Sequence, residues 1–252
     1  MRCRLLLTGH NDGFTNMGID ESIMIHVGQG ISPPTIRLYG WLPPAVSIGY
    51  FQGLEEEVDL DMCKNLETDY LRRITGGGAV FHEKEVTYSI SIPEADRLIP
   101  DNVLESYKVI CGGIIEGLKE LGISSKFVPL NDIIVEGKKI SGSAQTRRNR
   151  TVLQHGTVLI DTDVAKMFSL LIVPSEKLKD KLISDVKERV TSINSVLRRE
   201  VAFEDVVFAL AKGFERSLDI ELEEGKLTSN EMKLAQELIR DRYKNPEWNH
   251  RR

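Results

Sequence analysis

The 252-residue sequence has few aromatic residues, few cysteines and no long apolar run. No apolar stretch approaches the ~20 residues that a membrane-spanning helix needs. The first residues include two arginines but only a short apolar block, Leu5 to Leu7, which is too short for the apolar region of a secretory signal. The cysteines Cys3, Cys63 and Cys111 are odd in number and lack the spacing of metal ligands. We therefore expect a cytoplasmic protein in a reducing environment.

The chain also lacks an excess of positive charge. Its formal net charge is −5 and its basic residues form no long tract, so nucleic acid is not the expected partner. A local group of Arg147, Arg148 and Arg150 is interpreted as the solvated tip of a hairpin. With 41% hydrophobic and 28% charged residues, the composition is that of a globular protein. The length is sufficient for one large domain, or for a domain with a small appendage.

Hydrophobic periodicity divides the chain near residue 161 into a mixed first part and a mostly helical second part. In the first part we expect helices at 17–27 and 102–121, and strands at 37–39, 45–49, 69–73, 86–92, 132–136, 139–145 and 152–160. In the second part we expect helices at 162–172, 175–182, 193–197, 203–216 and 229–243, and a strand at 218–222. This order predicts an α/β (α+β) fold, a mixed β-sheet flanked by helices. We interpret residues 1–252 as a single domain whose helical portion folds onto the sheet.

The first chemical motif is R-R-I-T-G-G-G-A-V-F-H at 72–82. Three successive glycines after a strand allow backbone conformations closed to other residues and a close approach to a ligand. Their N–H groups can form an anion-binding nest, beside which Arg73 can neutralise a phosphate. The motif is neither a Walker loop nor a dinucleotide fingerprint. The alternative is that the triple glycine forms only a tight turn.

The second motif is N-D-I-I-V-E-G-K-K-I-S-G-S-A-Q at 131–145. Its strand–turn–strand pattern places Lys139 near the start of the second strand, where the side chain can reach what the glycine loop holds. A lysine so placed stabilises negative charge in a transition state. The Asp132 carboxylate is a possible magnesium ligand. The alternative is a surface hairpin in which Lys138 and Lys139 are ordinary solvated charges.

Two weaker signals accompany these motifs. Q-H-G-T at 154–157 lies on the next predicted strand and can bring His155 into the same cleft, although a lone histidine in a strand is often structural. S-I-G-Y-F-Q at 47–52 ends in Gln52, which can cap the pocket or can mark an ordinary exit from a strand.

The three motifs together resemble the lipoate-protein ligase family, in order and in approximate spacing. The likeness runs from about residue 17 to the end and includes Y-x-x-x-E-W-N at 243–249. The resemblance implies a fold similar to that of biotin ligases and class II aminoacyl-tRNA synthetases. It also implies activation of lipoate with ATP and magnesium to lipoyl-AMP, and transfer to a lysine of an acceptor protein. The implied acceptors are apo lipoyl domains of 2-oxoacid dehydrogenases or the glycine-cleavage H protein.

The resemblance also implies residue roles. Lys139 would be the catalytic lysine, which contacts both the α-phosphate and the acyl carbonyl. The nucleotide would contact Arg73, Gly78, Ala79, Val80, Phe81, Asn131 and Lys139. The lipoyl group would contact Gly76, Gly77, His82, Lys139 and His155, and magnesium would be held by Asp132.

One departure from the family concerns the end of the chain. Many members carry a further small C-terminal domain, whereas this sequence stops soon after E-W-N. Some archaeal-type ligases have that domain as a separate polypeptide. We therefore expect a separate small accessory protein as partner, and weak or absent lipoate adenylation by this chain alone.

A second departure concerns a sister group, the cysteine-dependent octanoyltransferases. The segments at 98–107, 143–147 and 153–156 also resemble those enzymes, whose nucleophile is expected in the loop before the 131–145 hairpin. This chain has F-V-P-L-N-D there, without a cysteine, and Cys111 lies within a predicted apolar helix. We therefore predict an ATP-dependent, AMP-forming lipoate-protein ligase.

Two alternatives stay open. One is ATP-independent octanoyl or lipoyl transfer. The other is a non-catalytic module that binds an acyl-nucleotide or a carrier protein, against which the presence of Lys139 argues. Biotin is a less favoured substrate because the G-R-G-R-x-x-R signature of biotin ligases is absent.

Overall fold

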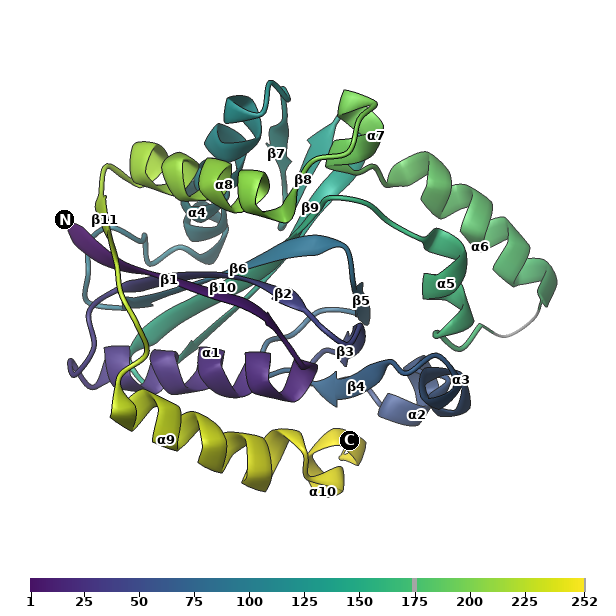
Figure 1. Cartoon of the computed structure of the whole chain (residues 1–252), viewed down its shortest axis with the longest axis horizontal. Helices are drawn as coiled ribbons and strands as arrows, with labels where there is room; N and C mark the ends of the chain where they lie inside the picture. Colours follow the sequence, from purple (N-terminus) through teal and green to yellow (C-terminus); the bar gives the residue numbers. More distant parts are fainter. Residues whose placement is uncertain (174–175, 252) are drawn as a thin grey trace.

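A computed structural model describes residues 1–173 and 176–251, which form one large and one small β-sheet with helices around them (Figure 1). The large sheet has eight strands in the order β11-β1-β2-β6-β10-β9-β8-β7. Its strands are β1 (Arg2–Asn11), β2 (Thr35–Trp41), β6 (Glu85–Pro93), β7 (Lys126–Val128), β8 (Asp132–Val135), β9 (Lys138–Arg148), β10 (Thr151–Leu159) and β11 (Glu221–Glu224). β1 runs parallel to β2 and β11, and the remaining pairs are antiparallel, so the predicted mixed sheet is confirmed.

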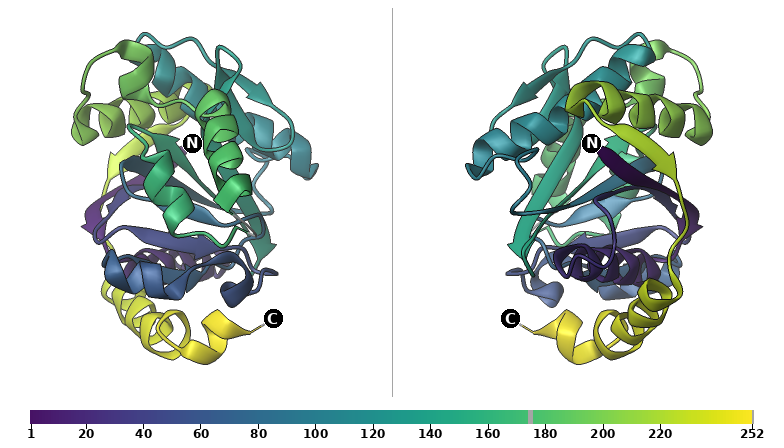
Figure 2. Two further views of the ribbon diagram at one scale, coloured as in Figure 1. Left: turned by 90° about the vertical axis from the view of Figure 1, so that its right-hand side faces the viewer. Right: turned by 90° about the vertical axis from the view of Figure 1, so that its left-hand side faces the viewer.

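Helices cover both faces of this sheet (Figures 1 and 2). One face carries α4 (Val103–Glu120) and α8 (Phe203–Leu218), and the other carries α1 (Gly13–Gly28) with α9 (Ser229–Leu238) outside it. The remaining helices are α2 (Leu54–Glu57), α3 (Leu60–Asn65), α5 (Val164–Ser169), α6 (Glu176–Arg189), α7 (Ile193–Leu197), the π-helical turn η1 (Ile239–Tyr243) and α10 (Pro246–His250). The predicted flanking of a mixed sheet by helices is thus also confirmed.

Strand β6 shows how its sequence separates the two faces. Because side chains alternate along a strand, Val86, Tyr88, Ile90 and Ile92 all enter the apolar core under α4 and α8. The intervening residues point to the other face, where Glu85, Thr87, Ser89 and Ser91 are also buried. Both faces of β6 are therefore shielded from water, and they differ strongly in polarity.

Helix α1 meets the polar face. It begins after Asp12, whose carboxylate accepts the Thr15 N–H at 2.8 Å. Its Asp20 is 2% exposed and pairs at 2.7 Å with Arg37 of β2, which is itself fully buried. A buried charge of this kind is tolerated only with close partners, so the pair fixes α1 on the sheet.

The second sheet takes up three short strands from the first part of the chain. β3 (Ala45–Ile48) follows β2 in sequence, yet it pairs with β4 (Asp69–Arg72) and β5 (Val80–His82) in a three-stranded sheet of order β4-β3-β5. The intervening Pro43 and Pro44 lack N–H donors and cannot continue a ladder. The chain therefore leaves the large sheet and enters the small one.

The helices after residue 161 pack against three different parts of the molecule. α8 lies against α4, α9 lies against α1, and α5 and α6 stand beside the end of the sheet near β5 (Figure 1). The helix expected at 229–243 is interrupted after Leu238 by the π-helical turn. Of the helix expected at 175–182, residue 175 lies outside the described residues. No helix in the described part is long and apolar enough to span a membrane.

Candidate functional site

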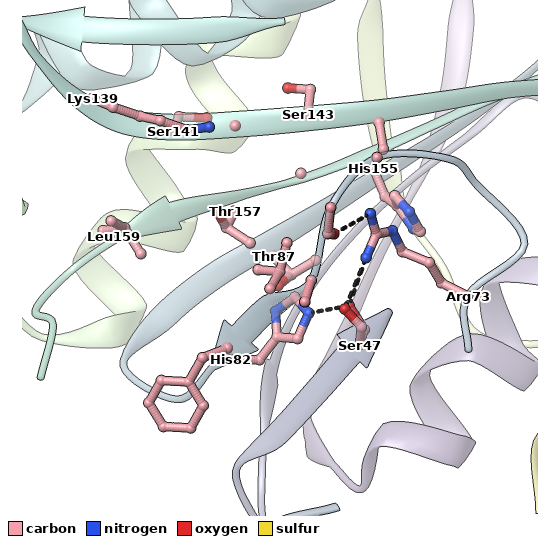
Figure 3. A pocket seen from close by; sticks show the side chains of 18 of the residues that line it. Ser47, Arg73, His82, Thr87, Lys139, Ser141, Ser143, His155, Thr157 and Leu159 are labelled. Atoms are coloured by element: carbon pink, nitrogen blue, oxygen red, sulfur yellow. Dashed lines mark hydrogen bonds between the residues drawn. The ribbon is translucent and has the colours of Figure 1, made fainter. Parts of the chain in front are cut away.

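A pocket of about 400 Å³ lies between the two sheets (Figure 3). Its apolar wall comes from segments that are distant in sequence: Met17, Tyr39, Trp41, Val80, Phe81, Leu159, Val164, Met167, Val186 and Val190. Its polar residues include Ser47, Arg73, His82, Asn131, Lys139, Ser141, Ser143 and His155. A mostly apolar cavity with a few converging polar groups is the usual form of a small-molecule site.

Lys139 lies at one end of this pocket, near the start of β9 (Figure 3). The ladder between β8 and β9 slips at this point, and such a bulge re-aims a side chain. The Lys139 ammonium contacts the Asp132 carboxylate at 2.7 Å, and its side chain remains 42% exposed. A Cβ at Gly142 would lie 2.7 Å from the Lys139 ammonium, so the glycine leaves room for it.

The loop before β8 is tied to β9. The Asn131 side-chain amide donates to the Ser143 carbonyl at 2.6 Å, and the Ser143 N–H donates to the Asn131 carbonyl at 3.0 Å. These two hydrogen bonds hold Asn131 in the pocket wall. Its neighbour Asp132, predicted as a magnesium ligand, points at Lys139, and no group of three metal-ligating side chains occurs within the described ranges. The carboxylate thus orients the lysine here, and its role toward magnesium stays a prediction.

The glycine loop approaches strand β3 very closely. A Cβ at Gly49 would lie 2.0 Å from the Gly77 carbonyl oxygen, which leaves no space for any other residue there. Gly77 has φ +99°, a conformation that favours glycine. The predicted need for glycine is therefore met at Gly77, whereas a Cβ at Gly76 or Gly78 would meet open space.

Arg73 holds this loop from inside. Its guanidinium donates to the carbonyls of Gly76 at 2.7 Å, Gly78 at 2.8 Å and Ser47 at 2.9 Å. Burial lowers the pKa of Arg73 to about 10, which still leaves it charged at neutral pH. Its predicted role was to neutralise a phosphate; in this structure its donors are directed at the protein and shape the pocket wall.

His82 lies between a hydroxyl and a carboxylate. Its Nε2 is 2.8 Å from the Ser47 hydroxyl (Figure 3). Its Nδ1 is 2.8 Å from Glu85 Oε1. The ring stacks on Trp41, with centroids 4.0 Å apart and planes 13° apart. All of these groups are buried, and Ser47, His82 and Trp41 line the pocket.

His155 lies on β10 beside a different pair. Its Nε2 is 2.7 Å from the Thr75 hydroxyl, while its Nδ1 is 3.5 Å from Asp20. Burial lowers the pKa of His155, which outweighs the opposite effect of Asp20. The ring is therefore neutral at neutral pH and forms part of the pocket wall.

The cysteines lie outside the pocket. Cys3, Cys63 and Cys111 are all buried, and none of them is among the described residues that line it. Burial raises the pKa of Cys111 to about 11, so its thiol stays protonated at neutral pH. Its inert character agrees with the expectation from its position in an apolar helix.

The structure brings together most of the predicted site residues. Those that line the pocket are Arg73, Gly77, Gly78, Ala79, Val80, Phe81, His82, Asn131, Lys139 and His155. Gly76 and Asp132 are absent from the described pocket lining, but Gly76 accepts a hydrogen bond from Arg73 and Asp132 pairs with Lys139. Gln52 does not cap the pocket; its side chain accepts the Gly49 N–H at 2.9 Å. The roles predicted for these residues toward nucleotide, lipoyl group and metal remain predictions.

Sequence reasoning missed Ser47, Trp41 and Glu85. Ser47 belongs to the motif at 47–52, in which only Gln52 was predicted to reach the pocket, and Trp41 lies beyond the strand predicted at 37–39. A histidine with an acidic residue three positions later, His82 and Glu85, was a local signal that was available. The contribution of Val186 and Val190 could not be seen, because it depends on where α6 packs.

Curated relatives are similar over nearly the full length. An octanoyltransferase LipM of Brevibacillus brevis is 38% identical and covers 99% of both chains. An octanoyltransferase LipM of Geobacillus kaustophilus is 39% identical, covering 99% of this chain and 98% of its own.

Solved structures confirm the predicted fold. The bi-partite lipoate protein ligase of Thermoplasma acidophilum superposes with a TM-score of 0.89 at 32% identity, over 99% of this chain and 96% of that one. A lipoate-protein ligase A bound with ATP superposes with a TM-score of 0.85 at 30% identity, over 99% of both chains.

These comparisons correct the predicted activity. The prediction of an ATP-dependent, AMP-forming lipoate-protein ligase was wrong, because relatives that align with almost the whole chain are octanoyltransferases. The shared motifs do not separate the two groups, and neither does the absence of a cysteine from one loop. What holds is the broader expectation of an enzyme of the lipoate ligase and transferase group. The family model of the lipoyl protein ligase A/B catalytic domain matches residues 12–215, and the chain belongs to this family.

Proposed function

We propose that this protein transfers an octanoyl group from a thioester-bound carrier to a lysine of an apo lipoyl domain, without ATP. The observation that carries the proposal is an apolar pocket with the Lys139 ammonium at one end, in a chain similar to octanoyltransferases along its whole length. An acyl chain fits an apolar wall, while its polar carbonyl end needs a hydrogen-bond donor or a cation. The pocket offers both in one cavity.

The role of Lys139 follows from its position. Breaking an acyl–sulfur bond develops negative charge on the carbonyl oxygen and on the leaving sulfur. An ammonium held by Asp132 at 2.7 Å is already oriented and stabilises that charge with little reorganisation. Asn131, fixed by its two bonds to Ser143, offers further polar contact at the same end.

The proposed acceptors are lipoyl domains of 2-oxoacid dehydrogenases or the glycine-cleavage H protein. The similarity to a structure that includes a lipoylation system and its E2 lipoyl domain supports this choice. A separate accessory protein was predicted for lipoate adenylation, not for transfer from a thioester, and it remains a prediction. Full turnover from lipoate and ATP by this chain alone would contradict it.

The test supplies octanoyl carrier protein and apo lipoyl domain to the purified chain without nucleotide. We expect the acceptor to gain one octanoyl group, measured by intact mass. A parallel reaction supplies free octanoate with ATP and magnesium instead of the thioester. Acyl transfer that occurs only in the parallel reaction would overturn the proposal.

A pair of lysine variants tests the site itself. Lys139→Ala should slow transfer by about 10²–10³-fold, the usual cost of a lost electrostatic contact to a transition state. Lys138→Ala is the matched control, because Lys138 is the exposed neighbour on the same hairpin and does not line the pocket. Equal rates for the two variants would remove Lys139 from the mechanism.

A further inference from the structure

We propose that Asn249 and Trp248 are positioning residues for the end of the pocket that holds the tail of the acyl chain, and that they act through Arg72. This inference rests on the proposed transferase function, in which the acyl carbonyl lies at Lys139 and the chain extends away from it. The two residues belong to the motif E-W-N at 247–249, to which the proposed function gives no role. They lie on α10 and are absent from the described pocket lining.

The two adjacent arginines of the first motif hold different segments. Arg73 donates to the glycine loop, whereas the fully buried Arg72 donates to α10 and to the loop after β3. The backbone carbonyls that accept from the Arg72 guanidinium are those of Gly49, Tyr50 and Gln52 in that loop, and of Trp248, Asn249 and Arg251 in the α10 segment, 246–251. A buried cation requires such partners, so these bonds fix both segments relative to β4.

The side chains of α10 in turn pair with the backbone of Arg72. β4 is an edge strand of the small sheet, and one side of it has no neighbouring strand in the described part of the chain. The Arg72 N–H donates to Asn249 Oδ1 at 2.8 Å, and the Trp248 indole N–H donates to the Arg72 carbonyl at 2.9 Å. Asn249 Nδ2 donates to the Tyr243 carbonyl at 2.8 Å, which orients the amide. Two side chains of α10 thus take the place of a further strand.

The loop after β3 connects Arg72 to the pocket. Gly49, whose carbonyl accepts from Arg72, lies so close to the glycine loop that a Cβ there would be 2.0 Å from the Gly77 carbonyl oxygen. The Tyr50 N–H donates to the Thr75 carbonyl at 2.9 Å. Gly77 lines the pocket. A shift of the loop after β3 would therefore move the glycine wall of the pocket.

The glycine wall lies where the tail of the acyl chain would bind. Figure 3 shows Arg73, which holds this wall, away from Lys139. A chain with its carbonyl at Lys139 therefore directs its last carbons, and not the reacting bond, toward the glycines. Trp248 supports the same region, because it packs against the apolar cluster that includes the pocket residues Met17 and Trp41. We expect α10 to control binding of the chain and not the chemical step.

The test compares acyl chains of two lengths. Transfer from octanoyl and from butanoyl carrier protein to apo lipoyl domain is measured for each variant, and kcat/KM is expressed as the octanoyl-to-butanoyl ratio. A loss of folded protein lowers both values equally and leaves this ratio unchanged. For Asn249→Ala we expect the ratio to fall about tenfold, through a higher KM for the octanoyl substrate at unchanged kcat.

A milder variant and a matched control accompany Asn249→Ala. Trp248→Phe keeps an aromatic ring but loses the donor to the Arg72 carbonyl, so the ratio should fall by a smaller factor, about threefold. Tyr243→Phe, in the preceding turn η1, loses a buried hydrogen bond to Glu21 at 2.7 Å and keeps every bond of Arg72. It should lower stability and leave the ratio at the wild-type value.

The outcomes separate this inference from the proposed function. If the wild type transfers neither acyl group, the proposed function fails, and the ratio of the dissociation constants of octanoate and butanoate, measured by calorimetry on the same variants, replaces the kinetic ratio. An unchanged ratio in both Asn249→Ala and Trp248→Phe would overturn the inference, as would an equal fall in Tyr243→Phe. If Asn249→Ala does not fold, Trp248→Phe alone decides.

Discussion

The two faces of the large sheet are formed by the same strands but are held by different interactions. Under α4 and α8, the side chains of β6 and β10 meet a largely apolar core, in which the Gln154 amide donates one buried hydrogen bond to the Tyr88 hydroxyl. Under α1, the alternate side chains of the same strands meet buried charges, hydroxyls and the pocket. Hydrophobic burial needs no fixed geometry, whereas each buried polar group needs a partner at a particular distance. The pocket lies on the polar face, where hydrogen-bond distances fix the positions of the side chains.

The contrast assigns different tasks to the faces. The apolar face supplies stability by excluding water, and it tolerates substitutions that preserve volume. The polar face holds Asp20 and Arg37, a pair whose net contribution is small but whose disruption leaves an unpaired buried charge. A substitution in the apolar face should therefore lower stability without changing octanoyl transfer, whereas substitutions in the polar face and the pocket can change either one.

The largest effect is expected from breaking the buried pair on the polar face. Asp20→Ala leaves Arg37 without its carboxylate and should lower the free energy of unfolding by about 3–5 kcal/mol. Urea denaturation measures the loss. Asp20→Asn, which keeps the hydrogen-bonding shape, should cost less. An equal cost for both variants would show that packing, not charge, governs this position.

A cavity in the apolar face should cost somewhat less and leave the chemistry unchanged. Ile110 of α4 is fully buried in the main core, and Ile110→Ala should lower the free energy of unfolding by about 3 kcal/mol. Octanoyl transfer per folded molecule should equal that of the wild type at low temperature. A parallel loss of transfer would contradict the separation of tasks.

Low pH should destabilise the packing of α9, the helix outside α1 on the polar side of the sheet. Burial alone would raise the pKa of Glu231 on α9, but hydrogen bonds from Arg4, Thr228 and Ser32 lower it from 4.5 to about 2. Because the folded-state pKa lies below the unfolded one, this stabilisation is present above pH 4.5 and is lost as the pH falls toward 2.

The change for Glu231 can be measured directly. Between about pH 6 and about pH 3, the wild type should lose about 2 kcal/mol more unfolding free energy than Glu231→Gln, whose side chain does not titrate. Urea midpoints of both proteins at the two pH values give the difference. Parallel pH dependence of the two proteins would contradict the assigned cause.

The smallest effect is expected at Gly142, beside the pocket. A methyl group there would meet the flexible end of Lys139, so Gly142→Ala should displace the ammonium from Asp132 with a stability change below about 1 kcal/mol. Transfer should fall about tenfold, equivalent to about 1.4 kcal/mol. A variant as active as the wild type would show that the position of the ammonium is not critical.

Local patterns predicted most elements of the fold. The helix expected at 102–121 is α4 at Val103–Glu120, and the helix expected at 193–197 is α7 at Ile193–Leu197. The pairing of the first strands was not predictable in the same way. The proline turn indicated where a strand ends, but only the packed structure shows that β3 belongs to another sheet.

The site was predictable only where its residues belong to local sequence motifs. Glycine, lysine and histidine motifs have fixed spacing, so Gly77, Lys139 and His155 could be identified from the sequence. The interaction of Ser47 with His82 joins positions that are 35 residues apart, and no local pattern encodes it. The activity was misjudged because ligases and transferases share these motifs, and one absent cysteine did not decide between them.

The sequence by itself determined most helices and strands, the position of the glycine loop and the resemblance of the chain to the lipoate ligase group, because these properties depend on neighbours along the chain. Tertiary structure alone decided that Lys139 pairs with Asp132, that Arg73 holds the glycine loop and that Ser47 meets His82 in the pocket. Those contacts depend on the distance between strands of two sheets, which is set by the packing of the whole molecule.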